Sequence, residues 1–206
     1  SVTSVSTSAA TYTSASSLPV SSTGQSSSSS SSAAAQARVG VFLDSAVWGI
    51  HYATSPSGKT GTTTSTGQYE YEDGDTVTFR IGDLTLPATL AKGVVTPTDL
   101  ALVDNEIDNN IQLNILRLLQ TLDKDNNPNN GIAIDQAAHD LFSGSQTVDF
   151  SASASVFAST VEPLIDTTLV TANDALNHFT HTLHSQLLGS WVYSEGQGKR
   201  NVLTFI

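Results

Sequence analysis

Apolar and polar residues alternate through much of the first half of the chain with a period of two residues. The clearest stretch is 68–72, where Tyr69 and Tyr71 fall on one side and polar residues on the other. After an Asp-Gly-Asp turn, the alternation resumes with Val77, Phe79 and Ile81. This period is typical of strands that bury one face and expose the other. We therefore expect residues 38–98 to form a small antiparallel β-sandwich.

Two apolar segments precede this stretch and belong to the same expected region. Residues 38–43 and 47–54 are rich in β-branched and aromatic side chains, which favour short strands. Asp44 and Ser45 lie between them and are common turn residues. Residues 55–67 are rich in Gly, Thr and Ser, and we expect them to form a long hairpin connection.

The second half of the chain changes to a spacing of three and four residues, which predicts helices over residues 99–190. The first run forms one expected buried stripe: Ile107, Ile111, Ile115, Leu118 and Leu122. Apolar residues at 134–142 predict a second, shorter helix.

A third apolar run predicts one long helix. Ser159 and Glu162 have the spacing of a capping box, with Pro163 in the expected first turn. The run that follows consists of Ile165, Leu169, Ala172, Leu176, Phe179, Leu183 and Leu187. Gly189 is expected to end this helix.

Together these patterns predict an α+β fold. A Ser-rich extended arm at 1–37 precedes the β-sandwich, and the helical region with its long helix follows. Residues 191–206 return to strand-like composition and are expected to begin a further β element. Because the sequence stops within an apolar segment, we expect the natural protein to continue past Ile206.

The composition narrows the class of protein. The chain of 206 residues has 8 Lys+Arg against 19 Asp+Glu, a formal charge of −11, and contains no Cys and no Met. Without Cys there is no disulfide framework, no Cys-ligated metal and no Cys nucleophile. The negative charge argues against non-specific binding to nucleic acid or anionic membranes. No apolar run approaches the ~20 residues that span a bilayer. A start at Ser1 without Met suggests a processed or excerpted chain, and we expect an exported protein.

The arm at 1–37 contains no charged side chain and includes seven consecutive serines from Ser26 to Ser32. Such a segment buries too little apolar surface to fold alone, so it resembles a flexible spacer. Its beginning nevertheless contains Val2, Val5, Tyr12 and many Thr, which favour strands. We hypothesise that residues 1–20 pack on a second copy of the chain or another surface protein, by adding a strand to its sheet.

Several motifs carry a resemblance to a known group of proteins. They are Phe42-Leu43-Asp44-Ser45, Gly67-x-Tyr69-x-Tyr71, Gly74-Asp75-x-Val77-x-Phe79-x-Ile81-Gly82, Asn114-x-x-Arg117-Leu118-Leu119-Gln120-Thr121-Leu122-Asp123-x-Asp125 and Asn130-Gly131-Ile132-x-Ile134. The chain resembles a module of bacterial surface lipoproteins and adhesin-like proteins over most of residues 38–206. The resemblance implies an extracellular or outer-membrane location. It also implies a lipid anchor on a Cys upstream of Ser1, followed by the Ser-rich spacer.

Residues 53–60 fit a relaxed Walker A pattern, with Ala53 in place of the first Gly. A phosphate-binding loop needs a strand before it and a helix after it. Here Gly and Thr residues follow and lead into the strand at 68–72. We therefore expect a hairpin loop rather than a nucleotide site.

A candidate calcium site follows the first predicted helix. Oxygen-bearing side chains recur at alternate positions: Asp123, Asp125, Asn127 and Asn129. Ca²⁺ prefers such hard oxygen ligands, and this spacing matches the start of an EF-hand-like loop. Pro128 stands where that loop requires Gly, and Ile134 stands where it requires Glu. The alternative is a helix C-terminal turn, in which Asn and Gly adopt left-handed conformations.

A second candidate metal site lies on the predicted long helix. Asp174, His178 and His181 fall on the side opposite the apolar stripe, at about 100° per residue. Together they could hold a transition metal such as Zn²⁺ or Cu²⁺. The alternative is a solvated polar face that contacts a neighbouring molecule.

The sequence contains no G-x-S-x-G nucleophile elbow and no other assembled catalytic set, so we expect no enzyme and name no catalytic residue. The favoured function is structural: an adhesin-like module of the bacterial surface, or a subunit of an extracellular assembly or filament whose arm packs on a neighbour. The alternative is a monomeric calcium- or glycan-binding surface lipoprotein module.

Overall fold

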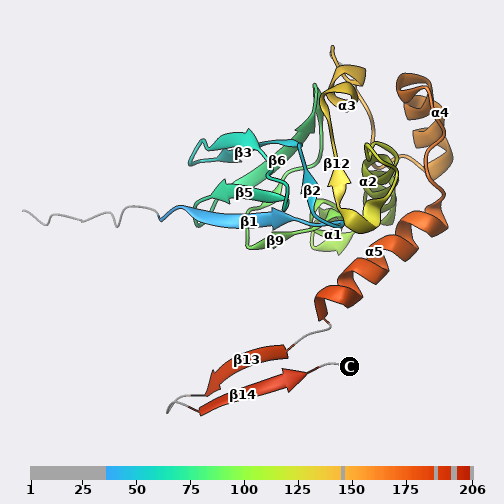
Figure 1. Cartoon of the computed structure of the whole chain (residues 1–206). Coiled ribbons are helices and arrows are strands. Elements are labelled where there is room, and N and C mark those ends of the chain that lie inside the picture. Colours follow the sequence, from blue (N-terminus) through green and yellow to red (C-terminus); the bar gives the residue numbers. More distant parts are fainter. Residues whose placement is uncertain (1–35, 145–146, 188–189, 196–198, 205–206) are drawn as a thin grey trace, which may run out of the picture. The chain divides into compact units, whose positions relative to one another are not determined.

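The computed structural model of the chain describes residues 36–144, 147–187, 190–195 and 199–204 (Figure 1). The fold is mixed α+β, with antiparallel sheets first and a helical region after them. The expected docking of residues 1–20 on a neighbour lies outside the described residues. Among the described helices, none has both the length and the apolar character that crossing a membrane requires.

Two sheets contain most strands of the β region. The first has the order β5-β1-β9, with β1 antiparallel to β5 and parallel to β9. Its strands are β1 (Arg38–Phe42), β5 (Gln68–Tyr71) and β9 (Val94–Val95). The second has the order β4-β3-β6-β7, and β8 also pairs with β6. Its strands are β3 (His51–Ser55), β4 (Thr60–Thr62), β6 (Thr76–Ile81), β7 (Leu84–Thr85) and β8 (Thr89–Leu90).

Aromatic side chains from both sheets meet in the core. The predicted alternation is confirmed, because the inward residues are all buried: Tyr69, Tyr71, Val77, Phe79 and Ile81. Phe42 of β1 stacks on Phe79 of β6 with ring centroids 4.2 Å apart. Tyr69 of β5 meets the same Phe79 edge to face at 5.5 Å. Such pairs add to the stabilisation that burial alone provides.

The expected strand at 47–54 is in fact two strands. β2 (Val47–Trp48) is separated from β3 by Gly49, whose φ of +79° is a left-handed conformation that glycine adopts without strain. A Cβ at this position would lie 2.2 Å from the carbonyl oxygen of Ile134. The break lets β2 pair in parallel with β12 (Ile132–Ala133), which lies beside it in Figure 1. A strand of the β region is thereby joined to the helical region.

The helical region is built from short elements. They are α1 (Pro97–Leu100), the hairpin β10 (Leu102–Val103) and β11 (Glu106–Ile107), α2 (Asn109–Thr121), the 3₁₀ helix η1 (Pro128–Asn130), α3 (Gln136–Leu141), α4 (Ala154–Ile165) and α5 (Ala172–Leu187). The buried stripe of α2 is confirmed from Ile111 onward. Ile107 instead lies in β11 and is exposed, because Asp108 caps the helix after it.

The single long helix expected from residue 159 is wrong. α4 starts after Ser153 and ends at Asp166, which is left-handed with a φ of 52°, and Pro163 lies in its last turn. α5 begins only at Ala172. Leu169 is buried although it lies in the connection between the helices. The apolar spacing therefore continues across a break that it does not reveal.

The end of the chain has strands where the sequence predicted them. β13 (Ser190–Glu195) and β14 (Lys199–Thr204) form an antiparallel hairpin.

Candidate functional site

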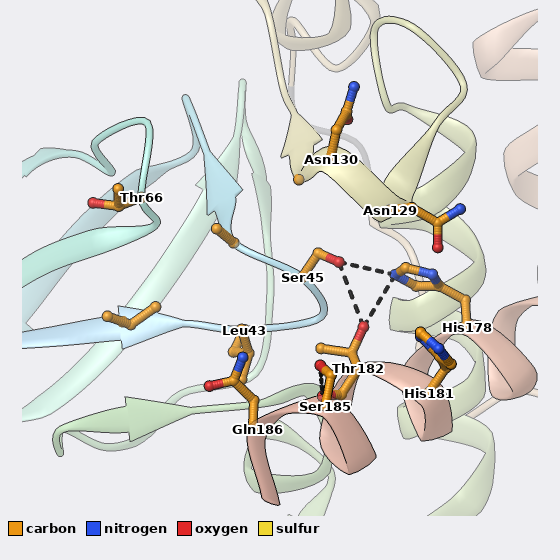
Figure 2. Close-up of a pocket in the computed structure, with 13 residues that line it drawn as sticks. Leu43, Ser45, Thr66, Asn129, Asn130, His178, His181, Thr182, Ser185 and Gln186 are labelled. Carbon is orange, nitrogen blue, oxygen red and sulfur yellow. Dashed lines mark hydrogen bonds between the residues drawn. The ribbon is translucent and has the colours of Figure 1, made fainter. Parts of the chain in front are cut away.

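A pocket of about 580 Å³ lies between the β1–β2 turn, η1 and α5. We call it the α5 pocket, and Figure 2 shows side chains from all three elements facing it. Its lining is Val41, Leu43, Ser45, Ala46, Thr66, Asn129, Asn130, Gly131, His178, His181, Thr182, Ser185 and Gln186. The polar groups of this lining are hydroxyls, amides and imidazoles, and its described residues include no carboxylate, ammonium or guanidinium group.

The β1–β2 turn presents Ser45 to the pocket in a left-handed conformation, with a φ of 60°. The turn is held by Asp44, whose buried carboxylate accepts from Gln120 Nε2 at 3.0 Å. The same Nε2 also donates to the carbonyl oxygen of Ala175. Gln120 of α2 therefore links the turn to α5. Burial raises the pKa of Asp44 well above its usual range, and the Gln120 hydrogen bond only partly opposes this.

His178 of α5 binds the same turn. Its Nε2 lies 2.9 Å from the carbonyl oxygen of Asp44 and 3.1 Å from Ser45 Oγ, which Figure 2 shows as a dashed line. Because a carbonyl oxygen can only accept, Nε2 must carry the hydrogen. Nε2 therefore cannot take a proton from Ser45 in this arrangement, as the base of a serine nucleophile would.

The surroundings of His178 also favour its neutral form. Burial lowers the pKa of His178, the hydrogen bond to Asp44 opposes this, and the nearby His181 lowers it further. The contact between Ser45 and His178 was not predicted from the sequence. The two residues lie far apart along the chain, and neither belongs to a motif that would connect them.

The candidate transition-metal set is not brought together. His178 and His181 both line the α5 pocket, but Asp174 does not. Its Oδ2 instead accepts from the Thr171 hydroxyl at 2.6 Å, and its backbone N–H donates back to Thr171 Oγ1 at the start of α5. Within the described part of the chain, no three His, Cys, Asp or Glu side chains are placed to hold a metal ion.

The candidate calcium residues lie in the loop after α2. Asp123 is buried, and its Oδ1 accepts from the backbone N–H of Ala133 at 2.9 Å. Asp125 is exposed and accepts from the Asn127 backbone and from Asn130 Nδ2. Asn129 Nδ2 lies 3.4 Å from Asn127 Oδ1. The loop also contains a left-handed Asn residue, Asn126, as the alternative of a helix C-terminal turn predicted.

The two carboxyl groups of this loop are close enough to influence one another. Burial raises the pKa of Asp123, and the negative charge of Asp125 raises it further. Hydrogen bonds from Asn130 and Asn127 lower the pKa of Asp125. The pair thus combines one buried carboxyl group that resists ionisation with one exposed carboxylate.

The Walker-like segment forms a hairpin, as expected. Residues 56–59 connect β3 to β4, which pair antiparallel, so the element directly after the loop is a strand and not a helix. Ser57 in this hairpin binds the carboxylate of Asp75, so the turn is fixed by a carboxylate and not arranged around a phosphate.

Comparisons with known proteins return no match: no family model, curated protein or solved structure matches this chain. The function must therefore be argued from the residues themselves.

Proposed function

We propose that this chain is a non-enzymatic, adhesin-like module of a bacterial cell surface. In this proposal, the α5 pocket binds a hydroxyl-rich ligand such as a glycan. The supporting observation is the lining of the pocket, which offers uncharged hydroxyl and amide groups and two imidazoles. Sugar hydroxyls both donate and accept hydrogen bonds, so they suit such a surface. The volume of about 580 Å³ lies within the ~300–1,000 Å³ typical of ligand sites.

Two histidines on α5 provide a matched test. His181 lines the pocket, whereas His184 is also exposed on α5 but lies outside the lining. We expect His181→Ala to weaken binding to a glycan selected on an array about tenfold, the effect of losing ~1.4 kcal/mol of contacts. His184→Ala should bind as the unchanged protein does. Equal affinity of all three proteins, measured by calorimetry, would contradict the proposal.

The same proposal includes the sandwich arrangement of the two sheets. The contacts of Phe42 and Tyr69 in one sheet with Phe79 in the other support it. Facing sheets of this kind place their loops and turns at the ends of the strands, where ligands commonly bind.

Self-association is a second candidate function. Val39 of β1 and Val94 of β9 are 56% and 49% exposed. Val94 is the parallel partner of Val41, which lies two residues from Val39 on the same side of β1. All three side chains therefore share one face of the first sheet. An exposed apolar face favours contact with a second copy or with another surface protein.

A further inference from the structure

One oxygen atom in the loop after α2 has no visible partner. Asp123 is only 3% exposed, and its Oδ1 accepts from the Ala133 N–H. Its Oδ2 is buried and has no hydrogen-bond partner among the described residues. A buried polar atom left in this state is costly, so it usually indicates a bound water, proton or ion.

The nearby cationic side chain does not fill this place. Lys124 extends toward Asp135, with Nζ 3.6 Å from Oδ2. Across the described residues, neither Asp123 nor Asp125 forms an ion pair with Lys or Arg. Among the described residues, no Lys or Arg side chain thus compensates the charge of the neighbouring Asp123 and Asp125 carboxyl groups.

We propose that Asp123 and Asp125 bind a Ca²⁺ ion, with oxygen atoms of residues 126–130 and water completing its shell. Ca²⁺ takes six to eight oxygen ligands in flexible geometry, whereas Zn²⁺ prefers nitrogen and sulfur. The loop offers mainly carboxylate, amide and carbonyl oxygens. Asn130, which now donates to Asp125, can present its amide oxygen instead if the amide rotates.

The ion would also act on the α5 pocket. Asn129 and Asn130 belong to the proposed ligand segment, and together with the next residue, Gly131, they form part of the pocket lining. Bound Ca²⁺ would fix this wall in place. The metal site stands on the loop alone, so it can exist whether or not the pocket binds a glycan.

A shared proton is the competing explanation. Two adjacent carboxyl groups can satisfy one another if one of them stays protonated. The two explanations differ in their response to calcium, because a protonated pair has no need of a cation.

Calorimetric titration of Ca²⁺ into the full chain, in calcium-free buffer near pH 7, tests the proposal. We expect one saturable site with a Kd of roughly 10⁻⁴–10⁻³ M, the range of extracellular calcium modules. Mg²⁺ should bind at least about tenfold more weakly, because it demands stricter octahedral geometry. Absence of a saturable site for Ca²⁺ would overturn the proposal in favour of the shared proton.

Three matched variants complete the test. Asp125→Asn changes an exposed residue and should weaken Ca²⁺ binding about tenfold or more. Asp123→Asn should abolish binding yet unfold at a higher temperature without calcium, because its amide can donate to Asp125. Asp104→Asn removes the same charge from an exposed left-handed turn position and should bind normally. Undiminished binding by Asp125→Asn would also overturn the proposal.

Discussion

At the scale of single residues, Asp75 is the most heavily bonded carboxylate of the β region. It is 1% exposed and accepts hydrogen bonds from the Ser57 hydroxyl, the Ser57 N–H and the Glu72 N–H. Burial alone would raise the pKa of Asp75, but the hydrogen bonds from Ser57 and Glu72 outweigh it and lower this pKa to about 2. The ionised form is therefore the one that holds the turn.

Asp75→Asn is expected to destabilise the fold most at neutral pH. The folded pKa of about 2 lies below the ordinary value of 3.8, so the carboxylate stabilises the protein above pH ~4. That contribution is lost as the pH falls toward about 2. Urea unfolding at several pH values should show that the difference in unfolding free energy between Asp75→Asn and the unchanged protein shrinks as the pH falls from ~4 toward about 2.

Asp73→Asn is the control, because Asp73 is exposed and its ion-pair partner among the described residues is the exposed Arg38. Exposed ion pairs contribute little, so its unfolding should follow the unchanged protein at every pH. If the difference in unfolding free energy between Asp75→Asn and the unchanged protein stayed constant from neutral to acid pH, the ionised Asp75 carboxylate would not be its cause.

Local sequence did not reveal this role of Asp75. It marked Asp75 as a turn residue, which is correct. The contacts with Ser57, however, require the β3–β4 hairpin to lie beside the turn. That proximity comes from the pairing of β3 with β6, and no short-range pattern contains it.

At the scale of elements, the break between α4 and α5 is held by contacts from elsewhere. Arg117 Nε donates to the carbonyl oxygen of Val170, and Thr121 Oγ1 accepts from its N–H. Glu162 Oε1 accepts from the N–H of Leu169. The connection is thus anchored on α2 and α4, which explains why it remains non-helical despite its apolar spacing.

Asp166 tests this break. It is exposed and ends α4 in a left-handed conformation. This conformation strains the backbone of Asp but not that of Gly. Asp166→Gly should raise the free energy of unfolding by roughly 0.5–1 kcal/mol, and Asp166→Ala should lower it by a similar amount. Thermal unfolding should then shift by a few degrees in opposite directions.

If α4 and α5 formed one continuous helix, Asp166→Ala would be more stable than Asp166→Gly. Ala favours the helix interior and Gly opposes it, by about 1 kcal/mol. If Asp166→Ala proved more stable than Asp166→Gly, the break would be contradicted.

Alternation and helical spacing predicted the elements best where a single element buries one face. The strands around Tyr69 and Phe79 and the stripe of α2 are such cases. Both patterns failed where a buried residue belongs to a connection, as at Leu169, or where Gly49 divides an apolar run. Burial depends on the whole fold, so a buried residue in a connection can continue the apolar spacing of a helix or strand without belonging to one.

At the scale of the whole molecule, the proposed self-association has two separate parts: contact through the outward face of β1 and β9, and addition of residues 1–20 as a strand to a neighbour's sheet. We expect the full chain to form multimers, and the chain without residues 1–35 to be monomeric, by light scattering after gel filtration. Val39→Glu should also weaken association, because it puts a charge on the exposed apolar face. Val156→Glu alters an equally exposed valine, on α4, and should not.

The same number of copies per particle for the full and shortened chains would contradict the role of the arm. If Val39→Glu and Val156→Glu weakened association equally, the face of β1 and β9 would not be the contact.

The α5 pocket illustrates what only the whole molecule determines. The sequence identified His178 and His181 as one polar face of a helix, and the structure has both in the pocket lining. The opposite wall, with Ser45 and Asn129, comes from distant segments. A single sequence contains no signal for such a meeting, because tertiary packing alone creates it.

The parallel pairing of β2 with β12 has a consequence for the order in which the protein forms. Two parallel strands cannot be joined by a tight turn. β2 can therefore pair only after Ile132 and Ala133, far later in the chain, have been made. As the polypeptide leaves the ribosome, the β region is complete only after α2 has been made. The β2–β12 pairing is therefore a late event, although both main sheets use only residues 38–95, because distant contacts must form before their gain is realised.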